Sequence, residues 1–117
     1  MTASDRAVEL TRAAAAAADD KSATGIVAFD VSEQIYITDV FVLCTTTSPT
    51  QARAVQDAVE ERLHTMGAKA VRREGSREGR WILLDFADIV VHVQHTEERA
   101  FYALERLWSD CPTVPVA

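Results

Sequence analysis

The segment between Arg80 and Val93 constrains the fold more than any other part of the chain, because two apolar runs flank a short acidic turn. The runs, residues 81–84 and 89–93, have strand length, so the segment predicts a β-hairpin. We expect Phe86 and Ala87 to form a two-residue loop. Strand alternation then places three cross-strand pairs on one face, namely Asp85 with Asp88, Leu83 with Val90 and Trp81 with His92.

The two faces of this hairpin differ in their chemistry. One combines a tryptophan, a histidine and two carboxylates with apolar residues, a mixture typical of a contact surface. Each of these residues also has a purely structural interpretation, in which Trp81 packs, His92 bonds within the sheet and the aspartates shape the turn. Their placement on one face favours binding. The other face is uniformly aliphatic and is predicted to form core, with Ile82, Leu84, Ile89, Val91 and Val93.

Length and charge limit the classes of protein to which the chain can belong. Its 117 residues suffice for one core, so we expect a single domain over 1–117, with an ordered core over about 5–110 and an extended tail over 111–117. A hydrophobic content of 48% predicts a globular protein. The net charge of −6, from 18 acidic and 12 basic side chains, argues against direct nucleic-acid binding and favours a basic protein partner.

The sequence carries no signal for secretion, membrane insertion or disulfide formation. The mixed charges before the alanine run differ from the basic start of a signal peptide, and no apolar stretch approaches the roughly 20 residues that span a bilayer. Cys44 and Cys111 have no C-x-x-C or zinc-type neighbours, so both are expected to be free thiols. We therefore expect a soluble, cytoplasmic protein with no membrane partner.

Capping signals and periodicity predict three helices. Ser4 or Thr2 can cap the first, which ends near Ala18 and has a thin apolar stripe, so we expect loose docking. The second starts at Ser48, where a serine, a proline and a glutamine form a capping box, and ends near Met66. The third is expected to be capped by Thr96 and to reach about Trp108, with a buried stripe of Phe101, Leu104, Leu107 and Trp108.

Strands are expected at 26–29, 40–44 and 70–72, in addition to the two hairpin strands. This order predicts an α/β or α+β domain with a mixed sheet of about five strands and three helices. So few helices cannot cover both faces of the sheet completely. The face that carries Trp81 can therefore stay open.

The motifs of the small enzyme classes are missing from the sequence. A nucleotidyltransferase needs neighbouring carboxylates of the D-x-D or D-x-E type to hold magnesium, and Asp85 and Asp88 instead lie across a turn. There is no G-x-S-x-G, Walker, G-x-G-x-x-G or H-E-x-x-H motif. His92 and His95 are expected on opposite faces, which disfavours zinc, and Cys44 is expected in the core. We expect a binding protein without catalytic residues, metal or cofactor.

Several motifs together resemble the ribosomal silencing factor family, also called RsfS or Iojap-related. They are residues 38–42, Ser48 with Gln51, Glu74 with Gly75, the string W-x-L-x-D-x-x-D-x-V-x-H over 81–92, and residues 102–108, which contain the string L-E-x-L-W. The resemblance covers residues from about 5 to 110. It implies a mixed-sheet fold similar to that of nucleotidyltransferases, but without catalysis.

The same resemblance implies binding to ribosomal protein L fourteen on the large subunit, where a bound copy blocks joining of the small subunit and lowers translation. Family members can also self-associate, so a homodimer is a further expectation. The alternative is a small nucleotide-processing enzyme of similar fold, which the missing carboxylates disfavour. The sequence departs from the family pattern at Phe86, Ala87 and Gln94, where tyrosine, glycine and a large apolar residue are common. The matching string places the contact surface on Trp81, Leu83, Asp85, Phe86, Asp88 and His92.

Overall fold

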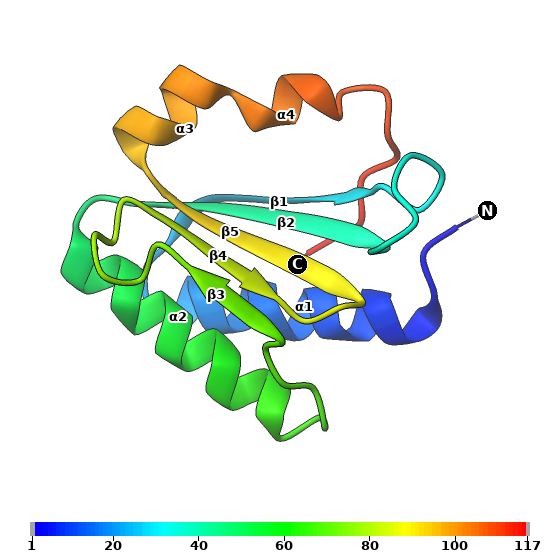
Figure 1. Cartoon of the computed structure of the whole chain (residues 1–117), viewed down its shortest axis with the longest axis horizontal. Helices are drawn as coiled ribbons and strands as arrows, with labels where there is room; N and C mark the ends of the chain where they lie inside the picture. The colour runs from blue at the N-terminus through cyan, green and yellow to red at the C-terminus, as the bar shows by residue number, and fades with distance from the viewer. Residues whose placement is uncertain (1, 117) are drawn as a thin grey trace.

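A single mixed sheet with helices on both of its faces forms the protein in the computed structural model, which describes residues 2–116 (Figure 1). Helices α1 (Asp5–Asp20) and α2 (Pro49–His64) cover one face, and α3 (Thr96–Tyr102) and α4 (Leu104–Leu107) lie over the other. The predicted class, an α+β fold with a mixed five-stranded sheet, is confirmed. The strands are β1 (Thr24–Asp30), β2 (Val40–Thr46), β3 (Arg72–Glu74), β4 (Trp81–Asp85) and β5 (Ile89–His95).

Strand β5 lies at the centre of the sheet, whose order is β1-β2-β5-β4-β3. It pairs in parallel with β2 and antiparallel with β4. A parallel pair needs a crossover connection, and α2 lies within the chain that links the two strands. Because β5 has neighbours on both edges and helices on both faces, six of its seven residues are buried. These include the polar side chains of His92 and Gln94.

Helix α1 packs closely against the rest of the core, so the expectation of loose docking is wrong. Ser4 caps the helix as predicted, because its Oγ accepts a hydrogen bond from Ala7 N at 3.0 Å. The alanines that made the stripe look thin let the helix approach its neighbours closely, and they lose no side-chain entropy on burial. The buried residues of this stripe include Ala7, Leu10, Ala14, Ala17 and Ala18.

The predicted start of α2 is confirmed. Ser48 Oγ accepts a hydrogen bond from Gln51 N at 3.1 Å, and Gln51 Oε1 accepts one in return from Thr47 N at 2.8 Å. The helix ends at His64, two residues before the predicted end. Gly67, with a φ of +80°, supplies the left-handed residue that follows it.

The hairpin of β4 and β5 is confirmed, but its predicted register is wrong. The cross-strand partners differ by two residues from the expected ones. Because this shift is even, every side chain stays on its predicted face, and the five aliphatic residues of the core face are at most 1% exposed. The observed pairs on the other face are Trp81 with Gln94, Leu83 with His92 and Asp85 with Val90.

The register follows from the position of Phe86. Its side chain is 4% exposed and belongs to the main core cluster, so Phe86 is not part of the loop. Phe86 N donates a hydrogen bond to Ile89 O at 2.9 Å, which makes these two residues the last pair of the hairpin. The loop therefore consists of Ala87 and Asp88, and Ala87 adopts a left-handed φ of +71°.

The predicted last helix is broken at Ala103, which has a left-handed φ of +46° and separates α3 from α4. Because of the break, residues before and after Ala103 do not share one continuous helical face, and half of the predicted buried stripe is wrong. Phe101 is 82% exposed and Leu107 is 70% exposed. Leu104 and Trp108 are partly buried and pack on a cluster that contains Phe29, Val31, Leu43 and Cys111.

Polar contacts help to hold this arm, residues 96–108, against the sheet. None of the described residues of α3 or α4 is fully buried. The N-cap of α3 is His95 rather than the predicted Thr96, because the His95 side chain accepts a hydrogen bond from Glu97 N at 3.2 Å. Further hydrogen bonds join Arg80 to Glu98 and Arg99 to Gly25 O, Thr45 Oγ1 and Glu105.

The chain end lies along the outer edge of β1. Asp30 N donates to Pro112 O at 2.8 Å and Val114 N donates to Ala28 O at 2.9 Å, so the tail continues the sheet beyond its edge strand. Val114 is buried in the main core cluster. Across residues 2–116, no helix has the length and apolarity needed to cross a membrane.

Candidate functional site

Along β4, one face of the sheet is only partly covered. Trp81, Leu83 and Asp85 alternate along this strand, and each is half-buried. The residues between them, Ile82 and Leu84, face the α1 and α2 layer and are fully buried. Helix α3 packs on β5 and β2, so the arm leaves the β4 side of the face accessible. We call Trp81, Leu83 and Asp85 the open strip.

The tryptophan of the open strip is fixed by a hydrogen bond to a buried histidine. Trp81 Nε1 donates to His92 Nδ1 at 3.1 Å. Because Nδ1 accepts, neutral His92 carries its proton on Nε2, and this atom has no hydrogen-bond partner among the described residues. Burial lowers the pKa of His92 from 6.5 to about 4, so the ring is neutral at physiological pH. His92 thus orients Trp81 and is not itself a surface group.

Aromatic rings continue from the open strip in two directions. On one side, the ring of Tyr102 lies 4.8 Å from that of Trp81, centroid to centroid. On the other, the ring of Phe41 lies 5.2 Å from His92 and 5.2 Å from Trp108. Such tilted and edge-to-face contacts are favourable. The series links the open strip to both parts of the arm.

The acidic turn at the end of the hairpin combines a structural and an exposed carboxylate. Asp85 Oδ1 accepts a hydrogen bond from Ala87 N at 2.8 Å, so this side chain shapes the turn. Asp88 is exposed, and its carbonyl oxygen accepts a hydrogen bond from Asp39 N at 3.0 Å. The turn therefore sits beside the start of β2 and presents negative charge to solvent.

The six predicted site residues do not all reach the surface. Trp81, Leu83 and Asp85 form the open strip, and Asp88 is exposed at its end. His92 lies under the strip with 6% of its surface exposed, and Phe86 is in the core on the opposite side of the sheet, with the α1 and α2 layer. The structure thus brings four of the six to the accessible face.

Sequence reasoning missed two residues that the fold places beside Trp81. Tyr102 contacts the Trp81 ring, and its one available signal is its position in the segment 102–108 that carries the family resemblance. Gln94 is the cross-strand partner of Trp81 and is completely buried. Both amide atoms of Gln94 lack a hydrogen-bond partner among the described residues. The signal for Gln94 was its departure from an apolar pattern.

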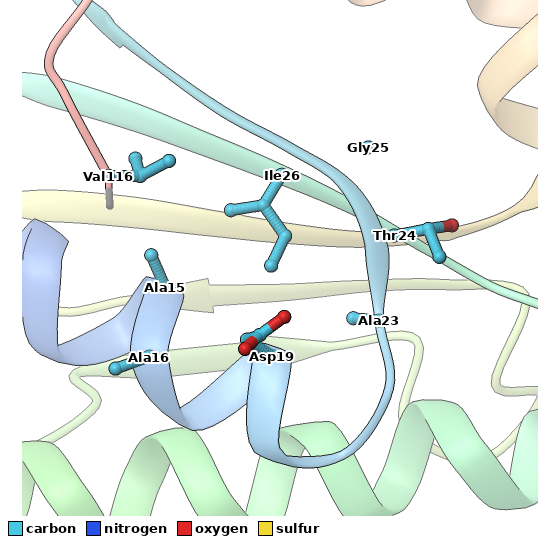
Figure 2. Close-up of a pocket in the computed structure, with 8 residues that line it drawn as sticks. All are labelled: Ala15, Ala16, Asp19, Ala23, Thr24, Gly25, Ile26 and Val116. Atoms are coloured by element: carbon cyan, nitrogen blue, oxygen red, sulfur yellow. The ribbon is translucent and has the colours of Figure 1, made fainter.

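Among residues 2–116 there is neither a cluster of metal ligands nor an activated thiol at Cys44. These residues contain no group of three or more histidine, cysteine, aspartate or glutamate side chains placed to hold a metal ion. Burial raises the pKa of the Cys44 thiol to about 12, so it is not a nucleophile at neutral pH. A pocket of about 620 Å³ lies between α1 and β1, at the sheet edge remote from β4 (Figure 2). Its lining is mostly small and apolar, with a single carboxylate, Asp19.

Comparisons with known proteins agree with the resemblance in the sequence. Residues 4–117 match a protein-family model described as "Ribosomal silencing factor during starvation". A protein of Halalkalibacterium halodurans named "Ribosomal silencing factor RsfS" is 41% identical over 91% of this chain and 91% of its own length. A protein of the same name from Bacillus subtilis is 39% identical over 88% of this chain and 87% of its own. "Protein Iojap, chloroplastic" of Zea mays is 32% identical over 86% of this chain and 43% of its own.

Two solved structures share the fold over most of its length. A crystal structure of a Chromobacterium violaceum protein superposes with a TM-score of 0.83 at 31% identity, covering 86% of this chain and 84% of that chain. A crystal structure of a Bacillus halodurans protein superposes with a TM-score of 0.79 at 38% identity, covering 92% of this chain and 97% of that chain. The likeness therefore extends over most of this chain and most of both solved chains.

Proposed function

Because this chain belongs to the ribosomal silencing factor family, we propose that it represses translation by binding ribosomal protein L fourteen and blocking joining of the small subunit. The observation that carries this proposal is the open strip. A tryptophan held by a hydrogen bond, a leucine and a carboxylate lie together on one strand face that the arm leaves accessible. Aromatic and apolar anchors of this kind carry much of the binding energy at protein interfaces.

The charge of the chain supports a basic partner. The net charge is −6, and acidic side chains line the open strip and its turn at Asp85 and Asp88. Ribosomal proteins are basic because they contact RNA, so such a partner is attracted electrostatically to this acidic chain. The same charge disfavours direct contact with nucleic acid.

The six residues implied by the family string have different roles in this proposal. Trp81, Leu83, Asp85 and Asp88 contact the partner, and the two others fix the shape of the contact surface from below. His92 orients the Trp81 ring through its hydrogen bond. Phe86 sets the register of the hairpin by its burial in the core.

Repression by occlusion needs no catalysis, metal or cofactor. The relatives are named as silencing factors, and we propose that this chain likewise acts as a regulator rather than as an enzyme, in the cytoplasm where ribosomes assemble. We also propose that two copies self-associate through the open strip, in competition with the ribosome. Exposed apolar side chains near the strip, such as Tyr102, favour such a contact.

Subunit association followed by light scattering tests the proposal. Purified large subunits are incubated with increasing amounts of the protein before small subunits are added. We expect inhibition to saturate at about one copy per large subunit, because a steric blocker acts by stoichiometric occupancy. When the protein is added to ribosomes whose subunits have already joined, it should dissociate them much more slowly than it blocks the joining of free subunits.

One result would contradict occlusion, and another would contradict the role of the open strip. Full inhibition far below one copy per subunit would indicate a catalytic agent. If a folded Trp81→Ala variant inhibits subunit joining as strongly as the wild-type protein, the inhibition does not depend on the open strip. Co-sedimentation with large and small subunits identifies the partner, and we expect the protein to be found with the large subunit.

A further inference from the structure

A pocket at the start of the arm lies next to the open strip and has its own chemistry. It has a volume of about 370 Å³ and is lined by Arg80, Glu97, Glu98, Phe101 and Tyr102. Arg80 is the residue before Trp81, and the Tyr102 ring is 4.8 Å from the Trp81 ring. We call this feature the arm pocket. It extends the open strip from β4 onto α3.

Two exposed rings form the apolar wall of the arm pocket. Phe101 is 82% exposed and Tyr102 is 50% exposed. Their centroids are 5.0 Å apart, and their planes meet at 80°, so the rings make a corner. Phe101 makes no other ring contact among the described residues, and polar contacts of Arg80 and Arg99 already hold α3 in place. The exposure of Phe101 therefore has no structural explanation within this chain.

The charged wall of the arm pocket carries an excess of negative charge. Arg80 donates to both carboxylate oxygens of Glu98, at 2.7 and 2.8 Å, so its guanidinium is committed to this residue. The same hydrogen bonds lower the pKa of Glu98, which keeps it ionised. Glu97 lies 3.6 Å from Arg80 Nη2, and its side chain is 78% exposed. Two carboxylates thus face one guanidinium, and Glu97 remains available to a second cation.

We propose that the arm pocket binds a lysine or arginine side chain of the basic protein that docks on the open strip. The stem of such a side chain packs in the ring corner, and its charged head reaches Glu97 and the ring faces. This inference rests on the proposed function, because it takes the occupant to be part of the same partner. Charge complementarity and continuity with Trp81 favour that occupant over an uncharged or acidic one.

Affinity for isolated ribosomal protein L fourteen tests this inference with three variants. Glu97→Gln removes the charge, Phe101→Leu removes the ring but keeps an apolar side chain, and the double variant combines them. Glu61→Gln, an exposed position on α2, is the matched control. At low salt we expect each single change to weaken binding about 2-fold to 10-fold, and the control to have no effect.

The double variant provides the sharper readout. If one cation contacts both Glu97 and Phe101, the loss in the double variant is smaller than the product of the two single losses. Raising the ionic strength should reduce the effect of Glu97→Gln and leave that of Phe101→Leu largely unchanged. Both side chains are exposed, so thermal unfolding should be the same for all variants.

Each outcome has a distinct meaning. If both single variants bind with wild-type affinity while Trp81→Ala binds more weakly, the inference about the arm pocket is overturned and the proposed function stays intact. Losses that simply multiply also overturn it, because they exclude a shared cation. Absence of wild-type binding overturns the proposed function and this inference together. A change in self-association alone, measured by sedimentation equilibrium, assigns the pocket to a second copy and contradicts the proposal.

Discussion

Replacing Gln94 by methionine should stabilise the protein, although it removes a polar side chain from the centre of the sheet. Gln94 is 0% exposed, and neither Oε1 nor Nε2 has a hydrogen-bond partner in the described chain. A buried polar group without a partner costs about 1 to 3 kcal/mol. Methionine has a similar length and volume, so the space stays filled. We expect a gain of about 1 to 3 kcal/mol in the free energy of unfolding.

Urea and thermal unfolding measure this effect. The midpoint in urea should rise while the m-value stays constant, because the surface exposed on unfolding is nearly the same. For a domain of this size, each kcal/mol corresponds to a melting temperature about 3 to 6 °C higher. Gln56→Met is the matched control. Gln56 is 8% exposed, but its Nε2 donates to Glu60 Oε2 at 2.9 Å, so this variant should be neutral or less stable.

One result would refute the reasoning. If Gln94→Met lowers stability by as much as Gln56→Met or more, the Gln94 amide makes hydrogen bonds in solution that offset its burial. A gain for both variants would show instead that methionine is favourable at any buried position of the sheet and α2. Only a gain at Gln94 with none at Gln56 identifies the unpartnered amide as the cause.

Three further predictions concern the open strip. Trp81→Ala should weaken binding to ribosomal protein L fourteen about 30-fold to 1,000-fold, measured by titration calorimetry on folded protein; an unchanged affinity would remove Trp81 from the interface. Asp85→Asn or Asp88→Asn should slow association more than Glu61→Gln in stopped-flow measurements at low salt, and equal rates would contradict a local acidic patch. The pKa of His92 is about 4 in the folded protein and 6.5 in the unfolded chain, so the contribution of His92 to stability should be complete above pH 6.5. Below that pH the free energy of unfolding should fall by up to about 1.4 kcal/mol per pH unit toward pH 4. His92→Gln should lack this pH-dependent loss, and a pH profile identical to that of the wild-type protein would exclude His92 as its cause.

Local signals in the sequence predicted the elements whose boundaries depend on neighbouring residues. The cap of α2 is an example, because Ser48 and Gln51 bond to backbone groups within four residues. The aliphatic face of the hairpin is another, since strand alternation alone separates Ile82 and Leu84 from Trp81 and the rest of the open strip. These features need no knowledge of the tertiary fold.

The register of the hairpin could not be predicted in this way. The loop position depends on whether Phe86 or Ala87 enters the core, and the space for Phe86 is made by elements far away in the sequence. The outcome forces alanine into a left-handed conformation at position 87, a cost that local propensity counts against it. Tertiary packing of an aromatic side chain outweighs this cost.

The break at Ala103 decides which part of the sheet face the arm covers. A continuous helix over 96–108 would align Phe101, Leu104 and Trp108 on one buried stripe, as the periodicity predicts. The break instead lets Trp108 pack edge-on against Phe41 of β2, while Phe101 remains in solvent next to Tyr102. The arm thereby completes the core over β1 and β2 and leaves Trp81 accessible. A single left-handed residue thus separates the part of the arm that stabilises the fold from the part that borders the open strip. The helical periodicity of the sequence does not predict this residue.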